Sequence, residues 1–274
     1  MAMSLELLAH LDLSAASGLV HRDGFLYVVA DDDLALVRTD LVGAQSVRLP
    51  LTDAPRTTHI SKHQKPDFEA LMSVGDSLVA IGSGSTPARR GAIALLGEVR
   101  RSVDLRPLYS TLDQRIHELN IEGAVVSGDD VFLAQRGNGA RRENALVRLD
   151  RFRFEQDLAL GLISEACLRE VLPVTLDTLG GVALSLTDLC LGPGGELIFT
   201  AAAEATENPY DDGVVAGSVV GVIDRRGGID DRLLVARGLK LEGVCWLENG
   251  ELRLVADPDD PTQRAPLFRA VWKA

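Results

Sequence analysis

The tetrapeptide Glu122-Gly123-Ala124-Val125 recurs in altered form at four other places along the chain. The related stretches are Ser17-Gly18-Leu19-Val20, Glu69-Ala70-Leu71-Met72, Asp188-Leu189-Cys190-Leu191 and Glu242-Gly243-Val244-Cys245. Successive stretches are separated by 52, 53, 66 and 54 positions. A repeat of this length, in which every unit begins with a short apolar strand, is typical of a β-propeller, where each unit forms one blade.

Each repeat predicts four antiparallel strands joined by tight turns. In the first repeat Asp23-Gly24 separates two apolar runs, which is a strong hairpin signal. The last repeat ends with the apolar run 267–272 and lacks a fourth strand, whereas residues 5–13 precede the first repeat and have strand-like apolar content. We therefore predict an all-β, five-bladed propeller in which the N-terminal strand closes the last blade.

The whole chain, 1–274, is predicted to form one propeller domain. Its blades start near residues 17, 69, 122, 188 and 242. The longer third interval predicts an insertion at 159–181, which forms a surface helix or loop, and residues 152–154 are predicted as the last strand of the third blade.

Composition excludes several functional classes. The net charge of −12 and an aromatic content of 4% argue against nucleic-acid binding, which requires phosphate neutralisation and stacking surfaces. No run of 18 apolar residues is present, and the N-terminal stretch lacks the basic region of a signal peptide, so no membrane partner is expected. Three widely spaced cysteines argue against a disulfide framework, and we predict a cytoplasmic location.

Four acidic residues occupy similar positions in different repeats. The inner strand of each predicted blade starts on the face where the loops between second and third strands lie, so these carboxylates are expected to meet around the axis. They are Glu69, Glu122, Asp188 and Glu242. Crowded carboxylates repel one another, and oxygen ligands suit Ca²⁺ or, as second choice, Mg²⁺, so we predict a metal site there. In the alternative interpretation, the carboxylates accept main-chain hydrogen bonds that hold the ring together.

Basic residues are predicted at the same face. Arg89, Arg90, Arg136 and Lys240 are candidates for binding an anionic small molecule, because guanidinium groups pair with carboxylates and phosphates through two hydrogen bonds. Glu122 and His117 are candidates for acid–base catalysis. The sequence contains no nucleophile elbow, phosphate-binding loop, zinc-protease motif or dinucleotide fingerprint.

The repeats resemble those of bacterial propellers of the group that includes esterase-like phytases, SdiA-regulated proteins and SMP-30-type lactonases. The motifs that carry the resemblance are Tyr27-Val28-Val29-Ala30-Asp31-Asp32, Asp67-Phe68-Glu69, Asn120-Ile121-Glu122-Gly123 and Leu241-Glu242-Gly243. Residues 82–90 and 135–139 resemble most a small uncharacterised bacterial family. The group implies Ca²⁺ in the central channel, although Ser17 departs from an acidic pattern.

Two functions remain open from the sequence. One is a metal-dependent hydrolase of an anionic ester, phosphoester or lactone, in which the metal activates water. The other is a non-catalytic propeller that binds a ligand or protein and holds a structural metal or none. An open coordination position would favour the hydrolase.

Overall fold

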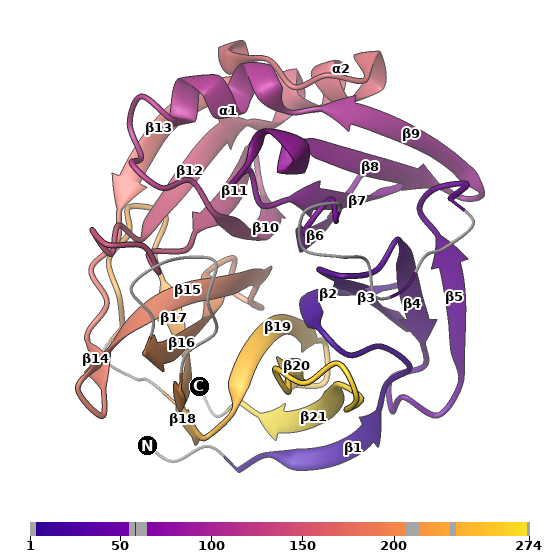
Figure 1. Cartoon of the computed structure of the whole chain (residues 1–274), viewed down its shortest axis with the longest axis vertical. Helices are drawn as coiled ribbons and strands as arrows, with labels where there is room; N and C mark the ends of the chain where they lie inside the picture. Colours follow the sequence, from indigo (N-terminus) through magenta and orange to yellow (C-terminus); the bar gives the residue numbers. More distant parts are fainter. Residues whose placement is uncertain (1–3, 55–57, 59–64, 206–213, 231–233, 273–274) are drawn as a thin grey trace.

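The computed structural model describes residues 4–54, 58, 65–205, 214–230 and 234–272. Five antiparallel sheets surround a central axis, as the view down that axis shows (Figure 1). The protein is therefore an all-β, five-bladed propeller. No described helix is long and apolar enough to cross a membrane.

The first three blades each contain four strands. Blade 1 comprises β2 (Ala16–Arg22), β3 (Phe25–Ala30), β4 (Ala35–Thr39) and β5 (Ser46–Pro50). Blade 2 comprises β6 (Phe68–Val74), β7 (Ser77–Gly82), β8 (Gly91–Leu96) and β9 (Val99–Asp104). Blade 3 comprises β10 (Ile121–Ser127), β11 (Asp130–Gln135), β12 (Ala145–Asp150) and β13 (Leu168–Pro173).

The fourth blade has five strands and the fifth is assembled from both ends of the chain. Blade 4 comprises β14 (Thr178–Leu179), β15 (Val182–Leu191), β16 (Leu197–Ala205), β17 (Val214–Ile223) and β18 (Leu234–Arg237). Blade 5 comprises β19 (Lys240–Leu247), β20 (Glu251–Asp257), β21 (Pro266–Val271) and the N-terminal β1 (Glu6–His10). The antiparallel pairing of β1 with β21 joins the two ends of the chain in one blade and confirms the predicted closure of the ring.

The segment after β12 differs from the sequence prediction. Residues 152–154 belong to helix α2 (Arg151–Leu160), and the fourth strand of blade 3 is β13, inside the predicted insertion. The side chain of Asp150 accepts the main-chain N–H of Arg153 and caps the helix, which ends at Gly161 with φ of 79°. The predicted strand at 152–154 is therefore wrong, because the capping residues stop β12 and start a helix.

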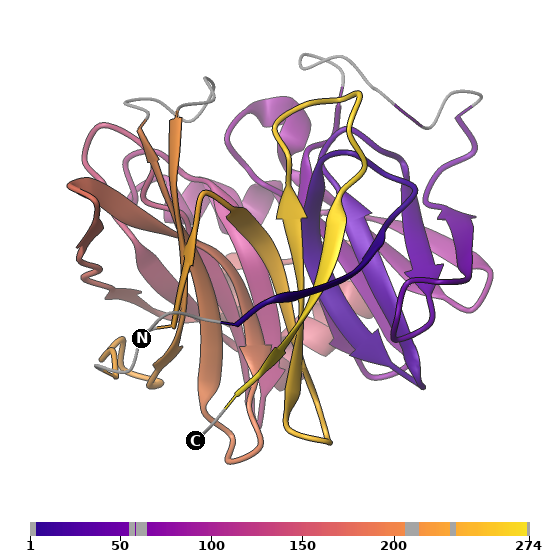
Figure 2. The ribbon, with the colours of Figure 1, turned by 90° about the horizontal axis from the view of Figure 1, so that it is seen from below.

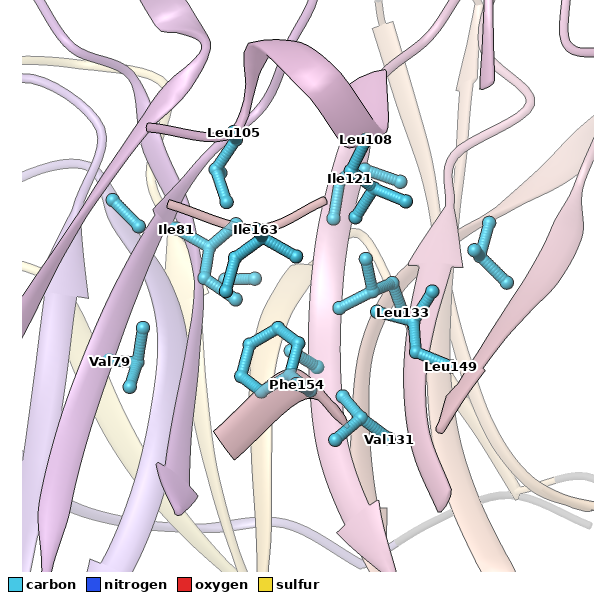
Figure 3. Close-up of a cluster of buried hydrophobic side chains, with 14 of the residues drawn as sticks. Val79, Ile81, Leu105, Leu108, Ile121, Val131, Leu133, Leu149, Phe154 and Ile163 are labelled. Carbon is cyan, nitrogen blue, oxygen red and sulfur yellow. The ribbon is translucent and has the colours of Figure 1, made fainter. Parts of the chain in front are cut away.

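Apolar side chains fill the spaces between neighbouring blades. The largest cluster joins blades 2 and 3 and includes residues of α1 (Arg106–Leu112) and η2 (Glu165–Cys167), together with Phe154 of α2 (Figure 3). A further short helix, η1 (Pro87–Arg89), precedes β8. Ile81 of blade 2 and Leu133 of blade 3 lie within this cluster, where Ile163 is fully buried. Burial of these surfaces fixes the blades and therefore the positions of the five inner strands.

Candidate functional site at the upper mouth of the channel

The inner strands β2, β6, β10, β15 and β19 line the central channel. All five run in the same direction, and we call the face on which they start the upper face; it carries the loop between β20 and β21 at the top of Figure 2. Polar side chains from the starts of the inner strands and from the ends of the second strands meet here.

A β-bulge in each inner strand orients the repeated residue. The pairing with the second strand shifts between Phe68 and Ala70, between Ile121 and Gly123, and between Leu241 and Gly243. The extra residue in these three bulges is Glu69, Glu122 or Glu242. A bulge re-aims a side chain out of the regular alternation, so the recurring signature encodes a backbone irregularity at the mouth of the channel.

The fourth blade departs from the predicted alignment. Its bulge falls between Leu186 and Asp188, so Thr187 takes the place of the glutamates. The hydroxyl of Thr187 donates to the main-chain oxygen of Leu241 at 2.7 Å. In the first blade the irregularity contains Ser17. The structural ring therefore contains three glutamates and two hydroxyl side chains.

Asp188 is the residue after Thr187 in β15, and its carboxylate is bound by the backbone. It is fully buried, and its two carboxylate oxygens accept the main-chain N–H groups of Leu189 and Val244, each at 2.8 Å. Burial raises the pKa of Asp188 well above its usual value, although N–H groups of Val244, Leu189 and Leu19 act in the opposite direction. Asp188, predicted as a metal ligand, instead accepts hydrogen bonds from the backbone, as in the alternative interpretation.

Small residues beside Asp188 form a narrow level that we call the waist. In the other four blades Gly18, Ala70, Gly123 and Gly243 follow the bulged residue. A Cβ atom on Gly123 would lie 2.8 Å from Cα of Asp188, and one on Gly243 would lie 2.6 Å from the main-chain oxygen of Ser17. Neighbouring inner strands therefore approach each other as closely as their backbones allow.

Arg136 occupies the centre of one group of acids, which we call the Arg136 cluster. Its guanidinium lies 2.7 Å from Glu122, 2.7 Å from Glu204 and 3.6 Å from Glu242. Lys240 lies 3.5 Å from the same oxygen of Glu242. Arg136 and Lys240 are buried, so two fixed cations already neutralise part of the acidic ring.

Further contacts immobilise the Arg136 cluster. The side-chain amide of Asn120 donates to the second oxygen of Glu122 at 2.7 Å. Lys240 also lies 2.8 Å from Asp259 and 3.4 Å from Asp257. Burial, together with Glu242, raises the pKa of Glu122 to about 8 against the opposing effect of Arg136. Burial, together with Asp259, raises the pKa of Asp257 to about 8.

A second acidic group, the Asp67 cluster, joins blades 1 and 2. It consists of Asp31, Lys65, Asp67, Glu69 and Arg89. Carboxylate oxygens of Asp31, Asp67 and Glu69 lie within 4.8 Å of one another, the only such acidic trio among the described residues. Lys65 pairs with Asp31 and lies 3.0 Å from Asp67, whereas Arg89 lies 2.8 Å from Asp67.

The electrostatics of the Asp67 cluster favour a further positive charge. Burial raises the pKa of Glu69 well above its usual value, and Asp67, Glu122 and Asp31 add to this effect. Burial also raises the pKa of Asp31 against the opposing effect of Lys65. Asp31 and Glu69 are half-buried, unlike Glu122 and Glu242, so this side of the ring is the part that solvent reaches. Asp67 adopts φ of 57°, an unfavourable value for aspartate.

Acids outnumber bases in the two clusters. Eight carboxylates belong to them: Asp31, Asp67, Glu69, Glu122, Glu204, Glu242, Asp257 and Asp259. Four basic groups face them: Lys65, Arg89, Arg136 and Lys240. The described residues of the mouth therefore include twice as many acidic as basic groups.

Two predicted site residues lie outside both clusters. Arg90 forms a two-pronged pair with Asp113, the residue that ends α1, at 2.6 and 3.0 Å. His117 is exposed, and its main-chain N–H donates to Glu143. Arg90 and His117 therefore have no part in the two clusters, whereas Arg89 belongs to the Asp67 cluster and Arg136 and Lys240 to the Arg136 cluster.

Five acidic members of the clusters are not among the predicted site residues: Asp31, Asp67, Glu204, Asp257 and Asp259. A sequence signal exists for Asp67, because it lies two positions before Glu69, just as Asn120 precedes Glu122 and Lys240 precedes Glu242. Glu204 lies at the end of β16 and reaches Arg136 from a different blade. No local pattern identifies that contact.

Comparisons with known proteins agree with this architecture. The model of a family described as "Family of unknown function (DUF6929)" matches residues 12–271. A putative glycoside hydrolase from Parabacteroides distasonis ATCC 8503 superimposes with a TM-score of 0.55 at 8% identity, covering 97% of this chain and 89% of that one. A putative glycosidase from Bacteroides thetaiotaomicron VPI-5482 gives 0.54 at 9% identity, covering 96% and 87%. The Bacillus subtilis arabinanase Arb43A gives 0.52 at 9% identity, covering 97% of each chain. No curated protein matches the chain.

Proposed function

Because the chain belongs to the DUF6929 family across residues 12–271, a family without an assigned activity, we propose a function from the site itself. The protein is a divalent-cation-dependent hydrolase whose active site is the upper mouth of the channel. Its substrate class is an anionic ester, phosphoester or lactone. The observation that carries this proposal is the convergence of Asp31, Asp67 and Glu69 within 4.8 Å in a mouth where acids exceed bases.

The Asp67 cluster has the donor set for a hard cation. Three carboxylates supply oxygens, which Ca²⁺ and Mg²⁺ prefer, and Glu69 and Asp31 are accessible from solvent. Lys65 would move away from Asp67 or remain as a neighbour of the ion. A bound divalent cation would polarise the scissile group of the substrate.

The chain's own residues would supply the remaining functions. An anionic substrate would meet repulsion from the excess acids, so it would bind where the cation offsets them, with Arg89 of the same cluster oriented toward its charged group. Glu122, with a pKa of about 8, holds a proton near neutral pH and is suited to general acid catalysis. Asn120 and Arg136 keep its carboxyl group in one orientation.

We predict that Ca²⁺ raises the melting temperature and that Asp67→Asn abolishes the increase. At free Ca²⁺ about 100-fold above Kd, ligand linkage adds roughly 2.7 kcal/mol, which corresponds to roughly 5 °C for a domain of this size. Calorimetric melts with excess Ca²⁺ or chelator measure the shift. Affinity is expected to rise with pH, because burial and neighbouring acids raise the pKa of Glu69, which must lose its proton to bind metal.

A matched control is Asp113→Asn, which removes a carboxylate paired with Arg90 outside the site. This variant should retain the Ca²⁺ shift. Equal melting temperatures with Ca²⁺ and chelator in the wild type would contradict the metal site. A shift that survives in both Asp67→Asn and Glu69→Gln would place the ion elsewhere.

Catalysis is tested separately with chromogenic phosphoesters, carboxylic esters and lactones, assayed with Ca²⁺, with Mg²⁺ and with chelator. Aryl glycosides belong in the same panel because three proteins of similar fold are described as an arabinanase, a glycoside hydrolase and a glycosidase. Cation-dependent turnover that Asp67→Asn and Glu122→Gln abolish, and that Asp113→Asn retains, would support the hydrolase.

A second candidate is a non-catalytic binding propeller. It is favoured by the pairing of Arg89, Arg136 and Lys240 with carboxylates, which gives the mouth a self-contained ion-pair network. Ca²⁺ binding without turnover on any substrate of the panel would support this candidate. We also propose a cytoplasmic location, since the three cysteines are buried and free.

A further inference from the structure

Lys65 lies within the proposed cation site, although that proposal gives it no function. Its ammonium group pairs with Oδ2 of Asp31 and lies 3.0 Å from Oδ1 of Asp67. The Lys65 side chain is only 8% exposed. A buried positive charge is therefore already held by two of the three carboxylates that would bind a metal ion.

The contacts of Asp67 show which of its oxygens an ion would use. Oδ2 accepts hydrogen bonds from the hydroxyl of Ser83 at 2.6 Å and from the guanidinium of Arg89 at 2.8 Å. Oδ1 is the oxygen that contacts Lys65. Because Ca²⁺ requires ligand oxygens at about 2.3–2.6 Å, an ion bound to this trio would compete with the ammonium group for Oδ1 of Asp67.

All three carboxylates of the trio act on the same ammonium group. Burial lowers the pKa of Lys65, but Asp31, Glu69 and Asp67 together raise it above its usual value, so the group stays charged. Lys65 precedes β6 and lies outside regular secondary structure. Its flexible four-carbon stem allows the ammonium group to leave the trio without displacing a strand.

We propose that Lys65 is a tethered competitor of the divalent cation. Its ammonium group holds the carboxylates of Asp31, Asp67 and Glu69 together in the ion-free protein and leaves them when Ca²⁺ binds. The inference rests on the cation site of the proposed function and adds the residue that sets the affinity of that site. Only the fraction of molecules in which Lys65 has left the trio is competent to bind the ion, so the apparent affinity is reduced by that fraction.

Lys240 provides the matched control for this proposal. Its ammonium group lies 2.8 Å from Asp259, 3.4 Å from Asp257 and 3.5 Å from Glu242, and its side chain is also 8% exposed. Lys240→Met therefore removes the same charge from the same mouth without freeing the Asp67 trio. A general change in the attraction of the mouth for Ca²⁺ appears in both variants, whereas release of the trio appears only in Lys65→Met.

Calorimetric titration with Ca²⁺ alone compares the full-length variants with the wild type. Lys65→Met should bind Ca²⁺ at least about tenfold more tightly than Lys240→Met, a difference of about 1.4 kcal/mol. Melting curves identify a variant that fails to fold, and Lys65→Gln, which keeps a polar end group, then takes the place of Lys65→Met. Equal affinities of the folded Lys65 variant and Lys240→Met would overturn the inference, as would a lack of Ca²⁺ binding by the Lys65 variant.

The ammonium group is also open to direct observation, because the chain contains only four lysines. In ¹H–¹⁵N spectra of the lysine ammonium groups of the wild type, the Lys65 signal, assigned with variants of the other three lysines, should shift or broaden on saturation with Ca²⁺. An unchanged signal in the saturated protein would overturn the inference while leaving the proposed cation site intact. Ca²⁺ binding by a Lys65 variant but not by the wild type would instead support the competition and contradict the proposed Ca²⁺-dependent hydrolase.

Discussion

Gly123→Ala is expected to lower the free energy of unfolding by about 1–3 kcal/mol, the usual cost of forcing an extra methyl group into a well-packed region. The new Cβ atom would lie 2.8–2.9 Å from three main-chain atoms of Asp188 and Leu189. Main-chain atoms cannot rotate away as a side chain can. The inner strands of blades 3 and 4 would have to separate, which would strain the hydrogen bonds between Asp188 and the backbone of Leu189 and Val244.

Gly91→Ala is the matched control for this prediction. Gly91 also lies in a strand, but a Cβ atom there would lie 3.7 Å from its nearest contact, the main-chain oxygen of Val103. This variant should be neutral or stabilised by up to about 0.5–1 kcal/mol, because alanine loses less backbone entropy than glycine on folding. Urea unfolding compares the two variants. Equal midpoints for Gly123→Ala and Gly91→Ala would show that the waist is not tightly packed.

The sequence predicted the propeller because the repeated signature encodes local backbone features. Glu122 and Gly123 illustrate this: the first is the extra residue of a bulge, and the second permits close approach of the next blade. Both requirements recur in blade 5 as Glu242 and Gly243. Such features depend on neighbouring residues and are therefore visible in a short motif.

The same reasoning could not assign the fourth blade. A one-residue displacement separates Thr187 from Asp188, and only the strand pairing shows which of them is the extra residue. Blade 3 presented a similar difficulty. Asp150 is the last residue of β12 and also caps α2, the helix that contains residues 152–154, for which a strand was predicted. Local apolar content does not distinguish these outcomes.

The contacts among the charged side chains of the mouth also could not be predicted from the sequence. Arg136 was predicted to bind substrate, but its guanidinium contacts Glu122 of the same blade and Glu204 of the next. A contact that a long side chain makes with another blade does not recur at the spacing of the sequence repeat. The contact depends on the distance between blades, which the packed cores set.

Arg136→Met is expected to lower the free energy of unfolding by about 3–5 kcal/mol at pH 8, the range for loss of one partner from a buried ion pair. Methionine keeps much of the volume and removes the charge. The side chains of Glu122, Glu204 and Glu242 would then remain buried, with Lys240 still near Glu242. Removal of a nearby positive charge raises the pKa of Glu122 and Glu242 further in the folded state, because Arg136 opposes the effect of burial on both.

The loss should depend on pH in a defined direction. A carboxyl group whose pKa is higher in the folded than in the unfolded state binds more protons when folded, so stability falls as pH rises between the two values. For Glu122 this window extends from about 4.3, the ordinary value, to about 8 in the wild type. In Arg136→Met the upper limit moves higher, so the part of the difference from wild type that Glu122 contributes should be small well below pH 8 and grow as the pH approaches and passes about 8.

Two variants separate this electrostatic effect from lost packing. Adding Glu122→Gln to Arg136→Met removes one uncompensated acid and should restore part of the stability at pH 8, with little effect at pH 5. Arg151→Met removes a half-exposed arginine paired with Glu155 in α2 and should cost about 0.5 kcal/mol or less at either pH. Chemical unfolding at pH 5, 6.5, 8 and 9 measures all of them. A loss in Arg136→Met that is the same at each pH would mean that Arg136 contributes through packing, and the acids around it would then need no cation to remain buried.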